Sequence, residues 1–502
     1  MEIRDVGGGD GPRLLHDMVD AACQARPGAT AVRDREGRWD YAELSRQSHG
    51  YAAWLRSRGV AAGDRVLVEA GPDRRVLAVL FACSRLGAIF VPVGDGATLV
   101  QWTHYVADCE PALIVTDVAE LAESNPGVTD TATAWAQASA FSGERYDGPP
   151  VPPTSAALLI YTSGSVAAPK AVICPHAQVV FAACRIAARL RYDADDVVFC
   201  RLPLSFDYGL YQAFLAALAG AELVLCGADA DARLLAEVRR HGATVVPVVP
   251  ALASMLIRLA GRDRRPTRVR LFTNTGEELP AASIDALRQR FPGAGVQLMF
   301  GITECKRVSV MEVDADRERR GAVGRPLDDT WVQILGPAGS ALPAGSAGEI
   351  VVFGPHVMAG YWRDEALTAR VFGRDPVTGQ RCLYTGDIGH LDADGYLYFH
   401  GRRDQIFKRH GVRTSALEIE AAAQDIPGVA EAAVVPPAGD TDAVLCVVAS
   451  IGAAEVLRCL RERLDAARVP ARCLVVDRLP RLGSGKLDRA GLPALIDRTV
   501  RR

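Results

Sequence analysis

The sequence predicts an α/β fold for a large N-terminal region, followed by a small α+β domain. Short apolar runs alternate with stretches of helical spacing, which is typical of βαβ units and a largely parallel sheet. The length of 502 residues is ample for a large core and predicts two to four domains. The dense charged turn from Gly401 to Lys408 is the expected domain boundary. Beyond it lie roughly 100 residues, a plausible domain size.

The expected elements follow from these spacings in chain order. Helices are predicted over 14–26, 41–58, 75–86, 178–191, 210–218, 417–424 and 456–464. Strands are predicted over 64–70, 88–93, 113–116, 156–161, 171–174, 245–249, 430–435, 443–449 and 473–476, and a strand ending in a turn is predicted within each of 271–277 and 297–304. Residues 348–362 and 384–399 predict short strands and turns of an all-β unit.

Composition excludes several classes of protein. The net charge of -3 gives no reason to expect a nucleic acid or an acidic membrane as partner. The polar, Gly-rich stretch 1–12 contains no apolar core of a signal peptide, and no uninterrupted apolar run has the length of a transmembrane helix. The 12 cysteines include no C-x-x-C pair and predict reduced thiols, so a cytoplasmic enzyme is expected, either a monomer or a homodimer.

A candidate phosphate-binding loop follows the apolar run that ends at Tyr161. It contains hydroxyls, one glycine, small residues, a proline and Lys170 (YTSGSVAAPK). Small side chains let backbone N–H groups approach an anion, and a lysine adds positive charge. The loop lacks the GxxxxGK[ST] pattern, so an ordinary P-loop NTPase is excluded.

Three further stretches carry candidate ligand groups. Asp207 is a lone acid in the apolar, aromatic stretch LPLSFDYG, where it is either a helix N-cap or a carboxylate that awaits a cationic ligand. The strands around Leu271 and Gln297 both end in turns of small residues (NTGEE and FGITE). Such turns predict a ligand crevice at the carboxyl edge of a parallel sheet.

Nine motifs in order resemble the adenylate-forming superfamily of acyl-CoA ligases, amino-acid adenylation domains and luciferases. They are YTSGSVAAPKAV, SFDYG, NTGEEL, FGITE, GEIVVFGPHVMAGYW, YTGD, GRRDQIFKRHGVR, EIE and LPRLGSGKLDR. The resemblance implies layered α/β subdomains plus a small β-barrel over 1–401, a hinge over 402–404 with Asp404 as its pivot, and a mobile α+β domain over 405–502. It also implies that a carboxylate and ATP form an acyl-adenylate, with release of pyrophosphate, before transfer to a thiol.

The resemblance assigns expected roles residue by residue. Lys486 would bridge the carboxylate and the α-phosphate, Thr303 would touch the α-phosphate, and Glu304 would hold Mg²⁺. The residues expected to bind ATP are Thr162, Ser163, Gly164, Ser165, Lys170, Thr275, Gly276, Glu277, Phe300, Gly301, Asp387 and Arg402. Within this set Asp387 would accept hydrogen bonds from the ribose. The residues expected to line the acid pocket are Phe206, Asp207, Tyr208, Tyr211, Thr273, Met299, Arg307 and Val308.

The position of Asp207 favours an amino acid as the substrate. Amino-acid-activating members carry an aspartate there that pairs with the substrate ammonium, and a buried carboxylate would be costly without such a partner. The sequence does not distinguish among small neutral amino acids, β-amino acids and aspartate-like acids as the substrate. Arg307 would pair with a second substrate carboxylate, or else face solvent or Glu278.

The expected acceptor is the phosphopantetheine thiol of a separate carrier protein, in natural-product assembly, because no carrier domain follows Lys486; CoA is the other option. One alternative is an acyl- or aryl-CoA ligase in which Asp207 is only a helix cap. A second is a catalytically dead nucleotide-binding scaffold. Its support is that Val166, Ala167 and Ala171 replace the usual Thr, Gly and Gly of the family loop.

Overall fold

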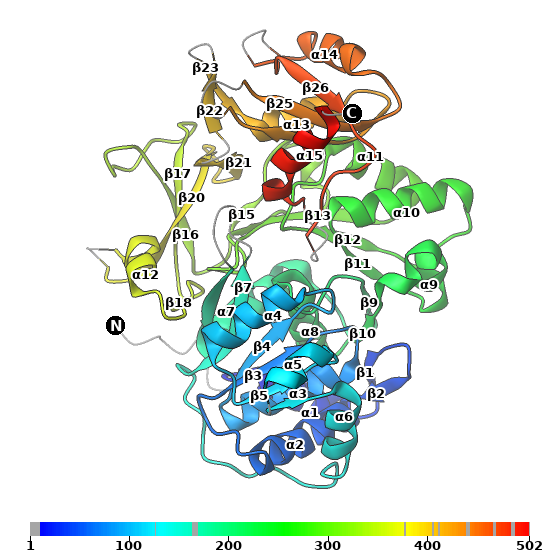
Figure 1. Ribbon diagram of the computed structural model, residues 1–502, viewed down its shortest axis with the longest axis vertical. Helices are drawn as coiled ribbons and strands as arrows, with labels where there is room; N and C mark the ends of the chain where they lie inside the picture. The colour runs from blue at the N-terminus through cyan, green and yellow to red at the C-terminus, as the bar shows by residue number, and fades with distance from the viewer. Residues whose placement is uncertain are drawn as a thin grey trace.

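A computed structural model describes residues 11–125, 127–162, 169–375, 378–403, 406–409, 412–437, 442–464, 468–482 and 487–500. Three sheets make up the N-terminal region, and a smaller domain lies at one end of the molecule (Figure 1). The predicted α/β class is confirmed. The domain boundary at 402–404 stays a prediction, because Asp404 lies outside the described residues.

The first sheet has seven strands in the order β18-β8-β7-β4-β3-β5-β6. Their bounds are β3 (Arg65–Glu69), β4 (Ile89–Val93), β5 (Leu113–Val115), β6 (Val128–Thr129), β7 (Ala156–Thr162), β8 (Lys170–Pro175) and β18 (Gly360–Tyr361). Strands β3 to β7 run parallel, while β8 and β18 are antiparallel to their neighbours. The sheet is therefore parallel in its centre, with an antiparallel edge beside the candidate phosphate loop.

The second sheet has nine strands in the order β15-β14-β13-β12-β11-β9-β10-β1-β2. Their bounds are β1 (Thr30–Arg33), β2 (Arg38–Asp40), β9 (Val197–Cys200), β10 (Glu222–Leu225), β11 (Val245–Val248), β12 (Leu271–Asn274), β13 (Gly295–Phe300), β14 (Ser309–Val310) and β15 (Arg325–Pro326). Strands β12 and β13 pair in parallel, so the two turns predicted to form a crevice leave the same edge of this sheet.

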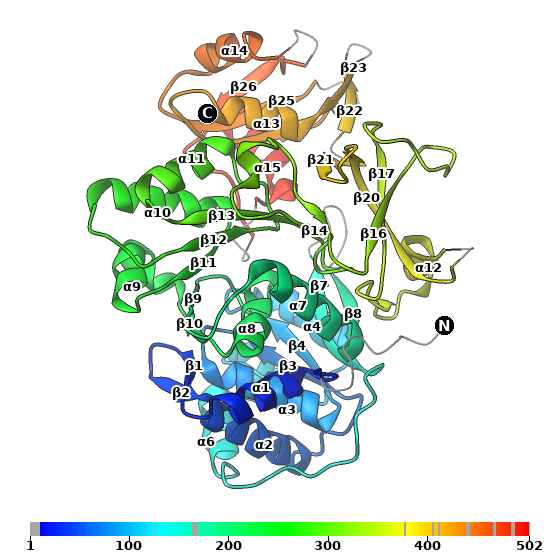
Figure 2. The same ribbon diagram turned by 180° about the vertical axis from the view of Figure 1, so that it is seen from behind.

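The third sheet is antiparallel throughout and occupies the place of the predicted small barrel. Its strands are β16 (Trp331–Leu335), β17 (Gly348–Phe353), β19 (Phe372–Arg374), β20 (Arg381–Leu391) and β21 (Leu397–Arg402). It lies to one side of the other two sheets in both ribbon views (Figures 1 and 2). Strand β18, from the same stretch of sequence, leaves this unit and joins the edge of the first sheet.

Most helices of the N-terminal region cover the first two sheets, whereas α12 (Glu365–Val371) packs against β18 and against β19 and β20 of the third sheet. The other helices of this region are α1 (Leu15–Ala25), α2 (Tyr41–Ser57), α3 (Arg74–Leu86), α4 (Leu99–Cys109), α5 (Ala119–Ser124), α6 (Thr131–Ser139), α7 (His176–Leu190), α8 (Asp207–Ala219), α9 (Leu234–Arg240), α10 (Pro250–Arg262) and α11 (Ala281–Arg290). In the described part of the chain, no helix is long and apolar enough to span a membrane.

The C-terminal domain has its own hydrophobic core. It contains a hairpin of β22 (Ile406–Arg409) and β23 (Val412–Ser415), and a sheet of β24 (Val429–Val435), β25 (Val444–Ala449) and β26 (Arg472–Val475). The helices are α13 (Ala416–Gln424), α14 (Ala453–Arg461) and α15 (Leu492–Val500). This α+β composition agrees with the elements predicted from the apolar runs.

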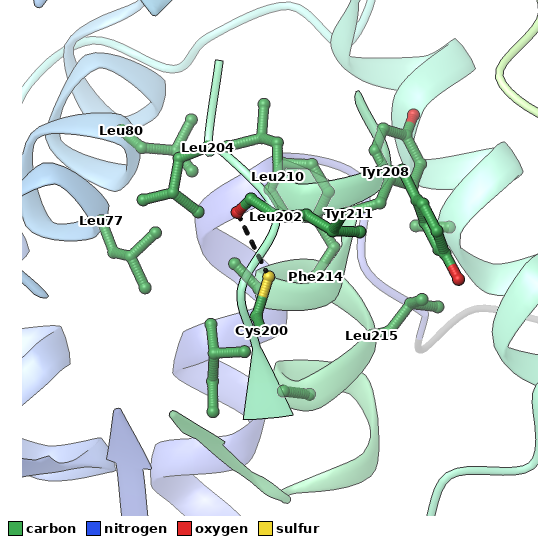
Figure 3. Close-up of a cluster of buried hydrophobic side chains, with 14 of the residues drawn as sticks. Leu77, Leu80, Cys200, Leu202, Leu204, Tyr208, Leu210, Tyr211, Phe214 and Leu215 are labelled. Atoms are coloured by element: carbon green, nitrogen blue, oxygen red, sulfur yellow. Dashed lines mark hydrogen bonds between the residues drawn. The ribbon is translucent and has the colours of Figure 1, made fainter. Parts of the chain in front are cut away.

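Helix α8 is the central helix of the main core. All its residues from Asp207 to Ala217 are buried, so it packs on every side and not only along one stripe. Figure 3 shows Leu77 and Leu80 of α3 on one side of α8 and Leu215 of α8 on the other, with Leu210 and Phe214 between them. The dense packing fixes the position of the helix, and with it the position of Asp207 at its first turn.

Replacing Phe214 by alanine tests how firmly this core fixes α8. The side chain is fully buried and meets Phe81 and Tyr211 edge-on. We expect Phe214→Ala to lower the free energy of unfolding by about 3–5 kcal/mol, because the cavity cannot fully collapse. Urea unfolding followed by tryptophan fluorescence measures this. Val100→Ala, at a side chain that is 79% exposed, is the control and should change little; an equal effect of both would contradict the prediction.

Candidate active site

A cleft of about 860 Å³ lies where the three sheets of the N-terminal region meet. Its lining includes many residues predicted to bind ATP or the acid: Thr162, Lys170, Phe206, Gly276, Glu277, Met299, Phe300, Gly301, Thr303, Glu304, Asp387 and Arg402. These residues come from separate stretches of sequence, and the fold brings them to one site. Leu482 of the C-terminal domain also lines the cleft. Lys486 follows it by four positions but lies outside the described residues.

The two ends of the candidate phosphate loop are well anchored. Thr162 and Lys170 are cross-strand partners at the ends of β7 and β8, and the Thr162 hydroxyl donates to the Lys170 carbonyl at 3.4 Å. His104 of α4 lies 2.8 Å from the Pro169 carbonyl oxygen through Nε2. Ser163, Gly164 and Ser165, and the departures at Val166 and Ala167, lie outside the described residues, so their roles stay predictions.

Glu304 lies in the turn after β13 and faces the cleft. The Tyr361 hydroxyl donates to its Oε1 at 2.6 Å, and the Met358 N–H donates to its backbone oxygen at 2.9 Å. The described residues contain no group of three or more His, Cys, Asp or Glu side chains that could hold a metal ion alone. A single carboxylate nevertheless fits Mg²⁺, which is commonly bound by one or two carboxylates together with substrate phosphates and water.

Asp387 and Arg402 face each other across β20 and β21. They are register partners, with Arg402 Nε 3.6 Å from Asp387 Oδ1. Asp387 is buried while Arg402 is exposed, so the carboxylate position is fixed by the sheet and the guanidinium lies at the rim. This arrangement can present an acceptor to a sugar hydroxyl.

An aromatic slot lies beside this carboxylate. Phe300 stacks on Phe399 with ring centroids 4.9 Å apart and planes at 28°. Gly276 turns the chain after β12 with a φ of +85°, a conformation that a side chain would strain. Phe399 lines the cleft too, although no sequence motif had singled it out. The flat apolar faces are suited to an adenine ring.

Asp207, which directly follows the cleft residue Phe206 in the chain, belongs to a buried cluster of charged side chains. Asp207 begins α8, with Phe206 as the N-cap, so the N-cap interpretation of Asp207 is wrong. Lys306, fully buried, approaches Asp207 Oδ1 with Nζ at 3.1 Å. Burial lowers the pKa of Lys306, but its interactions with Asp207 and Cys174 together raise the pKa above its usual value. The lysine is therefore charged.

Lys306 has an unusual backbone. Its φ is +67°, in the left-handed region that non-glycine residues rarely adopt. A Cβ on Gly301 would come within 2.2 Å of the Lys306 carbonyl oxygen, so the turn closes tightly on itself. Strain of this kind persists where the surrounding structure imposes it, and it often occurs at ligand sites. No sequence motif pointed to Lys306, because only the fold reveals that its side chain points inward.

Arg307 is also buried, so the alternative that it faces solvent is wrong. Its NH1 donates to the Lys306 carbonyl at 2.6 Å, and its guanidinium lies 5.2 Å from the centroid of the Tyr208 ring. Burial lowers the pKa of Arg307. Nε has no hydrogen-bond partner among the described residues.

The other predicted pocket residues divide into two groups. Phe206 and Met299 line the cleft. Tyr208, Tyr211, Thr273 and Val308 are buried and are not among the residues that line it; the same holds for Thr275, which was expected to bind ATP. The Tyr208 hydroxyl is 2.7 Å from the Thr273 hydroxyl, whereas the Tyr211 hydroxyl has no partner among the described residues.

Comparison with known proteins places this site in a family. The family model for AMP-binding enzymes matches residues 19–362, and the model for their C-terminal domain matches residues 418–486. The chain belongs to the AMP-binding enzyme family. It is an AMP-forming ligase, and enzymes of this family use ATP and Mg²⁺.

Individual relatives include both peptide synthetases and CoA ligases. One plipastatin synthase of Bacillus subtilis is 30% identical over 96% of the chain, which spans only 19% of that protein. Indoleacetate–CoA ligase of Aromatoleum aromaticum is 29% identical, with 96% of the chain and 98% of that enzyme covered. The chain thus spans about a fifth of the length of the synthase.

Several solved structures are also similar to this chain. The structure of VinN in complex with L-aspartate is 43% identical in sequence to this chain, with a TM-score of 0.72. The match covers 77% of this chain and 98% of the VinN chain. VinN with 3-methylaspartate is 40% identical, with a TM-score of 0.67 and the same coverage. O-succinylbenzoate–CoA synthetase of Bacillus subtilis, in complex with ATP and magnesium, is 25% identical with a TM-score of 0.82, and covers 95% of this chain and 99% of that one.

Replacing Asp387 by asparagine tests its predicted role as the ribose acceptor. Hydrogen bonds to a charged group are worth about 1.5–3 kcal/mol, so Asp387→Asn should weaken binding of a non-hydrolysable ATP analogue about tenfold or more. Isothermal titration calorimetry without the acid substrate measures this. Asp394→Asn removes a carboxylate that pairs with Arg319, and serves as the matched control. An unchanged affinity in Asp387→Asn would argue against the assignment.

Proposed function

We propose that the chain activates an amino acid with a second carboxylate, of the aspartate type, as its aminoacyl-adenylate. The activated group then passes to the phosphopantetheine thiol of a separate carrier protein. The observation that carries the proposal is the buried cluster of one carboxylate and two cations at Asp207, Lys306 and Arg307.

The charges of this cluster do not balance. Lys306 neutralises Asp207, which leaves the Arg307 guanidinium as an excess positive charge. A buried charge is costly unless it is paired and hydrogen-bonded. A substrate carboxylate would supply the missing anion, and a substrate ammonium would share Asp207 with Lys306. The cluster therefore favours a zwitterion with one extra carboxylate over an aryl or fatty acid.

Similarity to VinN supports the same substrate class. The structures of that protein hold L-aspartate and 3-methylaspartate, both amino acids with two carboxylates. These ligands belong to VinN, and their relevance here rests on the charged cluster of this chain.

The proposed reaction has two steps. In the first, a substrate carboxylate oxygen attacks the α-phosphorus of ATP, and the bond to pyrophosphate breaks. Lys170 and the loop before it would stabilise charge on the phosphates, and Mg²⁺ bound to Glu304 would neutralise more of that charge. Lys486 would contact the carboxylate and the α-phosphate. In the second step a thiol attacks the acyl carbon, and AMP leaves with the electron pair of the broken C–O bond.

CoA is the alternative acceptor. Indoleacetate–CoA ligase matches over nearly its whole length, which favours a CoA-dependent second step as a specific competing hypothesis. Product analysis with purified carrier protein or CoA, after adenylate formation, separates the two.

Two variants test the substrate class by pyrophosphate exchange into ATP, across α-amino, β-amino, aryl and short fatty acids. Wild-type enzyme should respond to aspartate-type substrates. Removing one partner of a buried charge pair costs about 2–5 kcal/mol, so Arg307→Leu should lose about 30-fold or more in kcat/KM for them. Asp207→Asn should lose activation of all amino acids.

The matched control is Arg319→Leu, which also removes a guanidinium over a tyrosine ring, 4.3 Å from the Tyr396 centroid. It should keep exchange activity. Activation of aryl or fatty acids alone would move the enzyme to the CoA-ligase class, and equal loss in Arg307→Leu and Arg319→Leu would refute the role of Arg307.

Replacing Lys486 by alanine separates the two half-reactions. We expect Lys486→Ala to lose adenylate formation, because the positive charge between the carboxylate and the α-phosphate is gone. A chemically prepared aminoacyl-adenylate should still react with the thiol. The measurement is pyrophosphate exchange for the first step and thioester formation by mass spectrometry for the second. Retention of both activities would show that the role of Lys486 is wrong.

A further inference from the structure

We propose that Tyr361 is a positioning residue for the metal-binding carboxylate. Its hydroxyl holds Oε1 of Glu304, so that Oε2 is kept for the Mg²⁺ that accompanies ATP. This inference rests on the role proposed above for Glu304, and it adds a residue that neither the motifs nor the comparisons assign.

The hydrogen bond occupies one oxygen of the carboxylate. The Tyr361 hydroxyl is 2.6 Å from Oε1, and within the described residues no hydrogen bond reaches Oε2. A carboxylate has two oxygens and several acceptor sites, so one bond orients it without exhausting it. Partners of this kind fix the orientation of metal ligands in many proteins.

The neutral phenol is suited to this task. An arginine or lysine at the same place would neutralise Glu304 and compete with the metal, whereas a hydroxyl orients the carboxylate and leaves its charge in place. A phenol loses its proton only at about pH 10, so the hydroxyl is a hydrogen-bond donor at neutral pH.

The fold holds Tyr361 firmly. Strand β18 consists of two residues, and Tyr361 pairs there with Val172 of β8. Its N–H donates to the Thr368 hydroxyl at 2.9 Å, and its ring meets Phe372 edge-on at 5.4 Å. Because the backbone hydrogen bond and the contact with Phe372 already fix the Tyr361 ring, its hydrogen bond to Glu304 costs little further conformational entropy.

The same segment makes a second hydrogen bond to Glu304. The Met358 N–H donates to the Glu304 backbone oxygen at 2.9 Å. The stretch from Met358 to Tyr361 therefore fixes both the backbone and the side chain of the candidate metal ligand. It also crosses from the third sheet to the first, so the position of Glu304 depends on how these sheets meet.

Tyr361 also reaches the phosphate side of the cleft. The Lys170 ammonium lies 5.9 Å from the centroid of its ring, within the range of a cation–π interaction. In the described part of the chain, Lys170 makes no salt bridge. Tyr361 thus contacts Glu304 through its hydroxyl and Lys170 through its ring.

The test is the affinity of Mn²⁺, a spectroscopic substitute for Mg²⁺, in the complex with a non-hydrolysable ATP analogue. No amino acid is present, so turnover does not contribute. Electron paramagnetic resonance counts free Mn²⁺ directly. We expect Tyr361→Phe to weaken Mn²⁺ about tenfold or more, in the range typical for loss of a partner to a metal ligand. Raising the Mg²⁺ concentration should restore pyrophosphate exchange in this variant.

The matched control is Tyr396→Phe, which removes a hydroxyl that donates to a glutamate, Glu312, at 3.1 Å and that does not line the cleft. It should leave Mn²⁺ affinity unchanged. Glu304→Asp is the second variant, because its carboxylate is one methylene shorter and should lose the hydrogen bond while keeping the charge.

Each outcome decides a separate point. If Tyr361→Phe lowers only the melting temperature and binds Mn²⁺ as wild type does, Tyr361 is structural and the inference is overturned. If Glu304→Gln also binds Mn²⁺ normally, the metal role proposed for Glu304 fails instead. Weakened Mn²⁺ binding in Tyr361→Phe and Glu304→Asp, with normal binding in Tyr396→Phe, would support the inference.

Discussion

The buried ion pair between Asp207 and Lys306 joins the central helix of the molecule to the turn that carries Thr303 and Glu304. Moving two charges out of water is expensive, and their attraction offsets this only when the geometry is good. The left-handed backbone of Lys306 shows that the turn accepts strain to place its ammonium there. Because α8 is packed on every side, the pair ties that turn to the most rigid part of the core.

The residues that line the cleft come from three sheets. The first sheet supplies Lys170 and the ends of the phosphate loop, the second supplies Glu304 and Phe300, and the third supplies Asp387. No single sheet holds enough groups to bind ATP. This division makes the segment from Met358 to Tyr361 important, because it crosses between sheets and contacts Glu304 on the way.

Substrate choice and nucleotide binding use different physical means. Apart from buried groups such as Asp387, ATP would meet exposed or half-buried groups, where water and phosphate oxygens can complete a metal's coordination. The acid would meet the buried charges of Asp207 and Arg307, where the low dielectric makes each unmatched charge costly. A ligand of the wrong charge would then leave the Arg307 guanidinium unpaired. Rejection of neutral acids would follow from that penalty, in addition to any effect of shape.

The sequence by itself determined the α/β class and the small C-terminal domain, because apolar periodicity and turn residues act locally. Most of the cleft residues followed from the resemblance of its motifs to the adenylate-forming superfamily. The sequence also placed Thr303 and Glu304 after the end of a strand, where parallel topology brings ligand groups together. Only the tertiary structure showed that Lys306 points inward at Asp207 and that Tyr361 reaches Glu304. These contacts join residues 99 and 57 positions apart, and no local pattern records which side chain will meet which across such a separation.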